Sequence, residues 1–138
     1  MMNQEKRKLI PKILSTSIDP DFIILFGSQA TGNARPDSDV DIAFYKENHG
    51  LSPYDIFMLA QELASHLQVE FVDLVDLQEA NTVFKSEIFK TGIPLFIRSQ
   101  YQYDMQELVA LRMHLKLQEE TAELREEIFR NGSVYGKR

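Results

Sequence analysis

The sequence has 138 residues, no cysteine, and 15 Lys and Arg residues against 21 Asp and Glu residues, which gives a formal net charge of −6. This length suits one domain, and 43% hydrophobic with 26% charged residues is a globular rather than a disordered composition. The lack of cysteine excludes disulfides, thiolate zinc sites and cysteine nucleophiles. The acidic balance argues against direct binding of nucleic acid, and no apolar run predicts a membrane span or a signal peptide. We therefore expect a cytoplasmic protein.

Apolar spacing and turn residues divide the chain into alternating helices and strands. The predicted elements, in chain order, are a short helix around residues 9–14, a strand at 22–26, a small polar loop at 27–33, a strand at 40–45, a helix from 53 to about 67, a strand at 69–77, a helix at 79–90, an edge strand at 93–97 and a helix at 105–130. Ser52 and Pro53 form a helix start, and Pro94 favours a sheet edge for the last strand. The pattern predicts an α/β (α+β) domain with a mixed sheet of four or five strands, flanked by helices.

One stretch of the sequence carries a pattern of catalytic residue types. Gly27 and Ser28 follow the first predicted strand, and after ten intervening residues Asp39 and Asp41 stand at the start of the second. A glycine after a strand lets the backbone approach a phosphate. The two-residue period of a strand puts both carboxylates on one face. Carboxylate oxygens bind Mg²⁺, so the pattern predicts a site for magnesium and a triphosphate.

A third carboxylate would complete a site for two metal ions. Asp73 in the middle of the third predicted strand can supply it, while Glu70 and Asp76 compete for the role. Asp76 lies near the strand end and is better suited to cap the following helix, and Glu70 at the beginning is expected to face water. We therefore select Asp73.

The spacing Gly27-Ser28-x10-Asp39-x-Asp41, together with Asp73, resembles the nucleotidyltransferase superfamily of the DNA polymerase beta type. The short chain further resembles the minimal nucleotidyltransferases (MNT), specifically the MntA-type antitoxins of HEPN/MNT toxin–antitoxin pairs. The resemblance implies a nucleotidyltransferase fold over residues 1–138, with a catalytic core at about 10–100 and a helical segment at about 101–130.

The resemblance also implies an activity, which is the transfer of AMP from ATP to a tyrosine hydroxyl of a partner HEPN ribonuclease toxin. In this reading Gly27 and Ser28 contact the triphosphate, and two Mg²⁺ ions are held by Asp39, Asp41 and Asp73. Arg35 is a further candidate phosphate contact that no family motif fixes. The partners implied are ATP and the toxin in a hetero-oligomer, with no direct nucleic acid and no membrane.

Two other functions remain open from the sequence. A nucleotidyltransferase acting on a small molecule shares the motif but normally needs extra chain to bind its acceptor. A non-catalytic antitoxin would act by binding alone, yet it gains nothing from clustered carboxylates that repel one another without a metal.

The last predicted helix is longer than the domain needs. Leu108, Leu111 and Leu115 are predicted to face the core, and we expect residues 119–129 to reach the toxin or a second copy of the chain. The alternative is that the segment folds back over the sheet as two helices. Tyr101 and Tyr103 at the beginning of this segment are candidates for self-modification.

Overall fold

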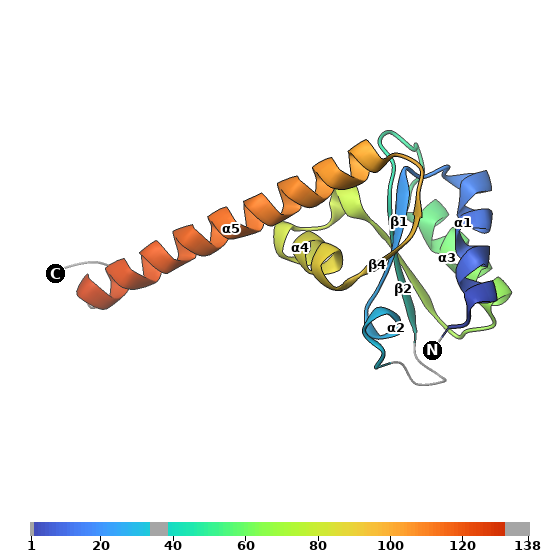
Figure 1. Cartoon of the computed structure of the whole chain (residues 1–138), viewed down its shortest axis with the longest axis horizontal. Coiled ribbons are helices and arrows are strands. Elements are labelled where there is room, and N and C mark those ends of the chain that lie inside the picture. Colours follow the sequence, from blue (N-terminus) through green and yellow to red (C-terminus); the bar gives the residue numbers. More distant parts are fainter. Residues whose placement is uncertain (1, 34–38, 132–138) are drawn as a thin grey trace.

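The computed structural model describes residues 2–33 and 39–131 (Figure 1). Its elements are α1 (Gln4–Ser17), β1 (Phe22–Phe26), α2 (Ser28–Thr31), β2 (Val40–Tyr45), α3 (Pro53–Leu67), β3 (Val72–Asp76), the 3₁₀ turn η1 (Leu77–Glu79), α4 (Thr82–Thr91), β4 (Ile93–Ile97) and α5 (Gln100–Asn131). The predicted α/β architecture, with a small mixed sheet, flanking helices and a long C-terminal helix, is confirmed.

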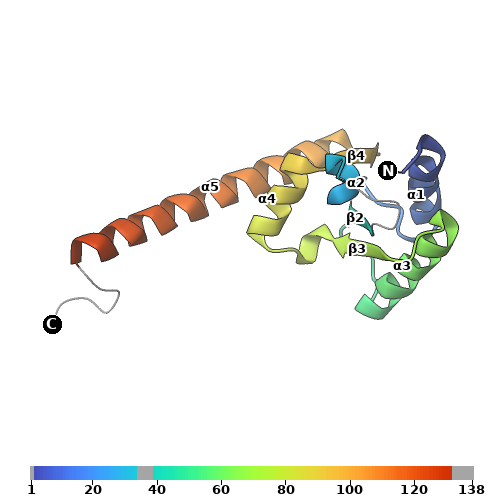
Figure 2. The same cartoon turned by 90° about the horizontal axis from the view of Figure 1, so that it is seen from below.

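The described strands form a four-stranded sheet in the order β3-β2-β1-β4. β1 is antiparallel to β2 and to β4, whereas β2 and β3 run parallel. Helices α1 and α3 cover one face, and α4 with the first part of α5 covers the other (Figures 1 and 2). β1 is buried along its whole length because both its faces are covered, which explains its uninterrupted apolar sequence.

Local chemistry fixes the ends of several elements. Ser52 and Asp55 form a capping box at the start of α3, in which each side chain accepts a hydrogen bond from the other residue's backbone N–H. This capping box confirms the predicted start of α3 at Ser52-Pro53.

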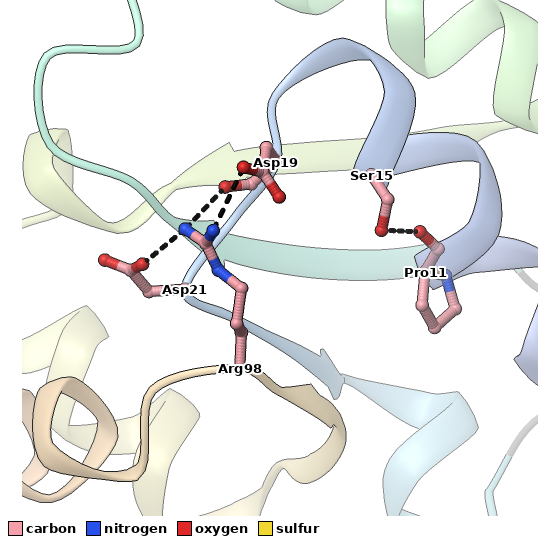
Figure 3. Close-up of polar contacts among 5 residues, drawn as sticks. All are labelled: Pro11, Ser15, Asp19, Asp21 and Arg98. Atoms are coloured by element: carbon pink, nitrogen blue, oxygen red, sulfur yellow. Dashed lines mark hydrogen bonds and ion pairs between the residues drawn. The ribbon is translucent and has the colours of Figure 1, made fainter.

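Inside α1, Pro11 has no N–H to donate, while its carbonyl accepts a 2.6 Å hydrogen bond from the Ser15 hydroxyl (Figure 3).

An ion-pair cluster ties the end of β4 to the turn between α1 and β1. The Arg98 guanidinium donates to the Asp19 carboxylate at 3.0 Å and to the Asp21 carboxylate at 2.9 Å, as Figure 3 shows. It also donates to the Asp19 carbonyl at 3.2 Å. Asp19 has a φ of 53°, a left-handed conformation, so the guanidinium holds a turn that its backbone does not favour.

Several details differ from the sequence prediction, including the last helix, which begins at Gln100 and not at residue 105. The third strand is shorter than predicted and covers Val72–Asp76, because Asp76 accepts a hydrogen bond from the Gln78 N–H and begins η1. The following helix begins at Thr82, where the Asn81 side chain caps it. The polar loop after β1 contains the short helix α2.

The C-terminal segment is one helix of 32 residues, about 48 Å long at 1.5 Å per residue. Its first half packs on the domain through Tyr103, Ala110 and His114, and its second half extends past α4 (Figure 1). The predicted core-facing role of Leu108 and Leu115 is wrong, since these side chains are 49% and 59% exposed. The alternative of two folded-back helices is also wrong. Within residues 2–33 and 39–131, none of the helices combines the length and apolar character needed to cross a membrane.

Candidate active site

The three predicted carboxylates gather at one end of the sheet. Asp41 lies opposite Asp73 in the parallel β2–β3 register and opposite Phe26 in the antiparallel β1–β2 register. Asp39 precedes β2 and lies two residues before Asp41, on the same side of the strand. Their neighbours Val40 and Val72 point into the core beneath α1 and α3, so the carboxylates face the opposite side of the sheet. The structure thus brings together residues that are 34 positions apart in the sequence.

The electrostatics of this cluster show that its members affect one another. The pKa of Asp41 is raised above its usual value of 3.8, first by burial and then by the negative charges of Asp73 and Asp39. Asp39 and Asp73 are exposed, while Asp41 is half-buried between them. The cluster is therefore a concentration of negative charge that a cation would stabilise.

Gly27 packs directly against Asp41. Its φ of 72° and ψ of −154° lie in a region that is essentially restricted to glycine. A Cβ atom built on Gly27 would overlap the Asp41 carboxylate oxygen Oδ2 and lie 3.0 Å from its Cγ. The sequence predicted a glycine that leaves room for a phosphate. In the structure, the lack of a side chain at Gly27 leaves room for the central carboxylate.

Ser28 begins α2 immediately after Gly27 and so follows β1 at the carboxylate end of the sheet. The buried Gln29 in the same short helix accepts a 3.1 Å hydrogen bond from the Met2 backbone N–H and fixes α2 against the N-terminus. No sequence pattern indicates this role of Gln29, because the contact joins residues 27 positions apart. Arg35, the further predicted phosphate contact, lies outside the described residues.

The donor set fits magnesium, which prefers carboxylate oxygens, and the mutual repulsion that raises the Asp41 pKa is what a bound cation would relieve. Among residues 2–33 and 39–131, however, no three acidic or histidine side chains already converge as tightly as a formed metal site. Carboxylates without a cation repel one another, so an open arrangement is expected. Asp39, Asp41 and Asp73 are the residues that could hold the metal.

The competing acidic residues have other roles. Asp76 caps η1 through Oδ1 and accepts a 2.8 Å hydrogen bond from His49 Nε2 through Oδ2. His49 Nδ1 accepts a hydrogen bond from the Leu51 N–H, so the proton of the neutral ring lies on Nε2 and points at Asp76. Glu70 is exposed, as predicted.

The fold and the placement of the carboxylates define a nucleotidyltransferase. Residues 8–101 match the family described as polymerase beta, nucleotidyltransferase, and the chain belongs to this family. It is 31% identical over 138 residues to the protein adenylyltransferase MntA of Shewanella oneidensis. This match covers 99% of this chain and 97% of that protein. The predicted resemblance is confirmed.

Solved structures agree with this assignment. A crystal structure of a toxin–antitoxin with AMP-PNP is similar with a TM-score of 0.78 and 31% identity, over 89% of this chain and 98% of that chain. A complex of tri-AMPylated Shewanella oneidensis HEPN toxin with MNT antitoxin has a TM-score of 0.74 and 30% identity, over 91% of this chain and 98% of that chain.

Proposed function

We propose that this chain is an antitoxin that transfers AMP from ATP to a tyrosine hydroxyl of a HEPN-domain toxin and thereby neutralises it. The observation that carries the proposal is the meeting of Asp39, Asp41 and Asp73 beside Gly27 at one end of the sheet. The similarity to an adenylyltransferase over the full chain, and to an antitoxin bound to an AMPylated HEPN toxin, supports the choice of AMP and of a protein acceptor.

In the proposed mechanism Asp39, Asp41 and Asp73 would hold two Mg²⁺ ions, which would supply neutralisation of charge on the triphosphate and on the leaving group. Gly27 and Ser28 lie on the β1 side and hold the β- and γ-phosphates. The tyrosine oxygen forms a bond to the α-phosphorus while the bond to the bridging oxygen breaks, so that pyrophosphate leaves. The hydroxyl proton passes to a carboxylate oxygen of Asp73. Positioning and charge neutralisation supply most of the rate, as in other phosphoryl transfers.

The test is a transfer assay with ATP labelled at its α-phosphate, magnesium and a purified cognate HEPN toxin. We expect label on the toxin and pyrophosphate in solution. No label should reach the toxin when EDTA removes the metal, or when the label is on the γ-phosphate and leaves with pyrophosphate. Toxin that is neutralised without becoming labelled would contradict the proposal and favour an antitoxin that acts by binding alone.

The extended half of α5 is expected to contribute to the complex and not to catalysis. Removal of the chain after Gln118 takes away residues that are mostly exposed, including Phe129 at 90%. We expect the truncated protein to keep its fold and its affinity for Mg-ATP, and to bind the toxin at least about tenfold more weakly, a change of 1.4 kcal/mol. Circular dichroism, nucleotide titration and calorimetry with the toxin measure the three properties. Aggregation or lost ATP binding would show that this segment belongs to the catalytic domain.

A further inference from the structure

A cavity of about 710 Å³ lies along the edge strand β3, and neither the motif nor the proposed mechanism uses it. We call it the β3 cavity. Its lining comes from the loop before α3, the first half of α3, and the chain from Phe71 through β3 to η1. Val72, Leu74 and α3 place the cavity on the α1 and α3 face of the sheet, whereas the carboxylate side chains face the other side. Asp73 belongs both to this lining and to the carboxylate cluster, so the edge strand β3 borders both the cavity and the candidate active site. Its volume is typical of a binding site for a specific ligand.

The chemistry of the β3 cavity is apolar and acidic. Phe57 of α3 and Phe71 before β3 line it, and their side chains are 54% and 52% exposed although both are large and aromatic. Asp73 and Glu79 also belong to its lining, and its third carboxylate, Asp76, is already paired with His49. Within the described part of the chain, no Lys or Arg side chain lines it. A triphosphate would be repelled there, whereas an apolar chain that carries basic residues would be attracted.

The edge of the sheet adds a second means of recognition. In the residues that the structure describes, β3 pairs with β2 and with no other strand. Backbone groups of successive strand residues point to alternate edges, so every second residue of Val72–Asp76 offers an unpaired N–H and C=O on the outer edge. An extended segment of another protein can hydrogen-bond to such an edge and insert alternate side chains into a neighbouring pocket.

The reaction geometry indicates which substrate arrives on this side. The attacking and leaving oxygens lie in line on opposite sides of the phosphorus in a phosphoryl transfer. In the proposed function the pyrophosphate leaves toward Gly27 and Ser28, which follow β1, so the attacking hydroxyl has to come from the opposite side of Asp41. That side is β3, with Asp73 and the β3 cavity.

We propose that the β3 cavity is the docking site of the acceptor protein: an extended, tyrosine-bearing segment with neighbouring basic residues lies along the edge of β3 and inserts apolar side chains between Phe57 and Phe71. This inference rests on the proposed function and specifies how its second substrate is recognised. Asp73 then receives the tyrosine from the segment, while Gly27 and Ser28 bind the nucleotide independently.

The test combines Phe57→Ala with Phe71→Ala and compares the variant with Met58→Ala. Met58 is the neighbouring residue on α3, is similarly exposed at 48%, and does not line the cavity. We expect the double variant to raise the KM for the toxin at least about tenfold, to leave kcat within about threefold, and to keep the affinity for Mg-ATP. Met58→Ala should match the wild type in all three quantities.

The possible outcomes separate the two proposals. Wild-type protein that transfers no AMP overturns the proposed function itself. Wild-type transfer with an unchanged KM in the double variant overturns only the assignment of the cavity. A parallel loss of Mg-ATP affinity would also overturn it, since the cavity would then hold the nucleotide base.

Hydrogen–deuterium exchange gives a measurement that does not depend on catalysis. In the complex of the Asp41→Asn variant with the toxin, we expect those backbone amides of Val72–Asp76 that point to the outer edge to exchange at least about tenfold more slowly than in the free variant, because strand addition protects edge amides. Protection confined to α5, with β3 exchanging as before, would overturn the docking site.

Discussion

Replacing Asp41 by Asn is expected to lower the rate of AMP transfer by about a thousandfold or more, because the residue is the central one of the three carboxylates proposed to hold the metal, and metal ions supply several kcal/mol of transition-state stabilisation. The same change should not destabilise the free protein. The pKa of Asp41 is raised in the folded state, first by burial and then by Asp73 and Asp39, so its ionisation opposes folding. Asn has the same shape and no charge, and it preserves the packing on Gly27.

The sign of the pH dependence follows from that shift. A carboxyl group with a raised folded-state pKa costs stability at neutral pH, and this cost disappears as the pH falls below the usual value of 3.8. We therefore expect Asp41→Asn to melt at an equal or higher temperature than the wild type at pH 7 without magnesium, and to lose this advantage in acid. Glu62→Gln, which removes one charge from the exposed side of α3, is the control and should remain active. An Asp41→Asn protein that unfolds or keeps full activity would assign Asp41 a structural role.

Gly27→Ala is expected to abolish transfer and to destabilise the fold. The backbone conformation of Gly27, with a φ of 72°, costs about 1–3 kcal/mol for a residue with a side chain. The new methyl group would also displace the Asp41 carboxylate that it overlaps. The loss should therefore appear both in the melting temperature and in the affinity for Mg-ATP.

Gly50→Ala separates these two contributions. Gly50 has a φ of 74°, close to that of Gly27, yet a Cβ atom there would meet no other atom within 4 Å. We expect Gly50→Ala to lower the stability by the backbone cost alone, about 1 kcal/mol, and to bind Mg-ATP as the wild type does. Equal effects of the two substitutions on nucleotide affinity would show that the contact between Gly27 and Asp41 does not matter for the site.

The sequence was sufficient to predict the elements whose ends are marked by local chemistry. β1 and β2 begin and end where predicted, because turn and loop residues flank both apolar runs. All residues of β1, and all but one of β2, are buried. Asp76 caps the turn after β3 as predicted, since a carboxylate near a strand end is well placed to accept from the next free N–H groups. The grouping of Asp39, Asp41 and Asp73 followed from strand periodicity and from the family resemblance.

Features that depend on distant contacts were not predictable. The periodicity of α5 identified apolar residues but not the face that packs, and the structure buries Ala110 while Leu108 and Leu115 face outward. A small residue allows close packing of two helices, and sequence spacing alone cannot distinguish this from a leucine contact. The overlap of Gly27 with Asp41, and the β3 cavity, arise from segments that meet only in the folded chain.

The positions of the strand ends bear on whether the protein could transfer AMP to its own Tyr103. Phe22 of β1 lies opposite Ile97, the last residue of β4, while Phe26 at the other end lies opposite Asp41. Tyr103 stacks edge-on against Phe22 with ring centroids 5.1 Å apart, and so sits at the end of the strand remote from the carboxylates. Four residue steps of a strand separate these ends by about 13 Å. We therefore expect any labelling of Tyr103 to be bimolecular, between two copies of the protein, because in this conformation Tyr103 lies at the far end of the strand from the carboxylates.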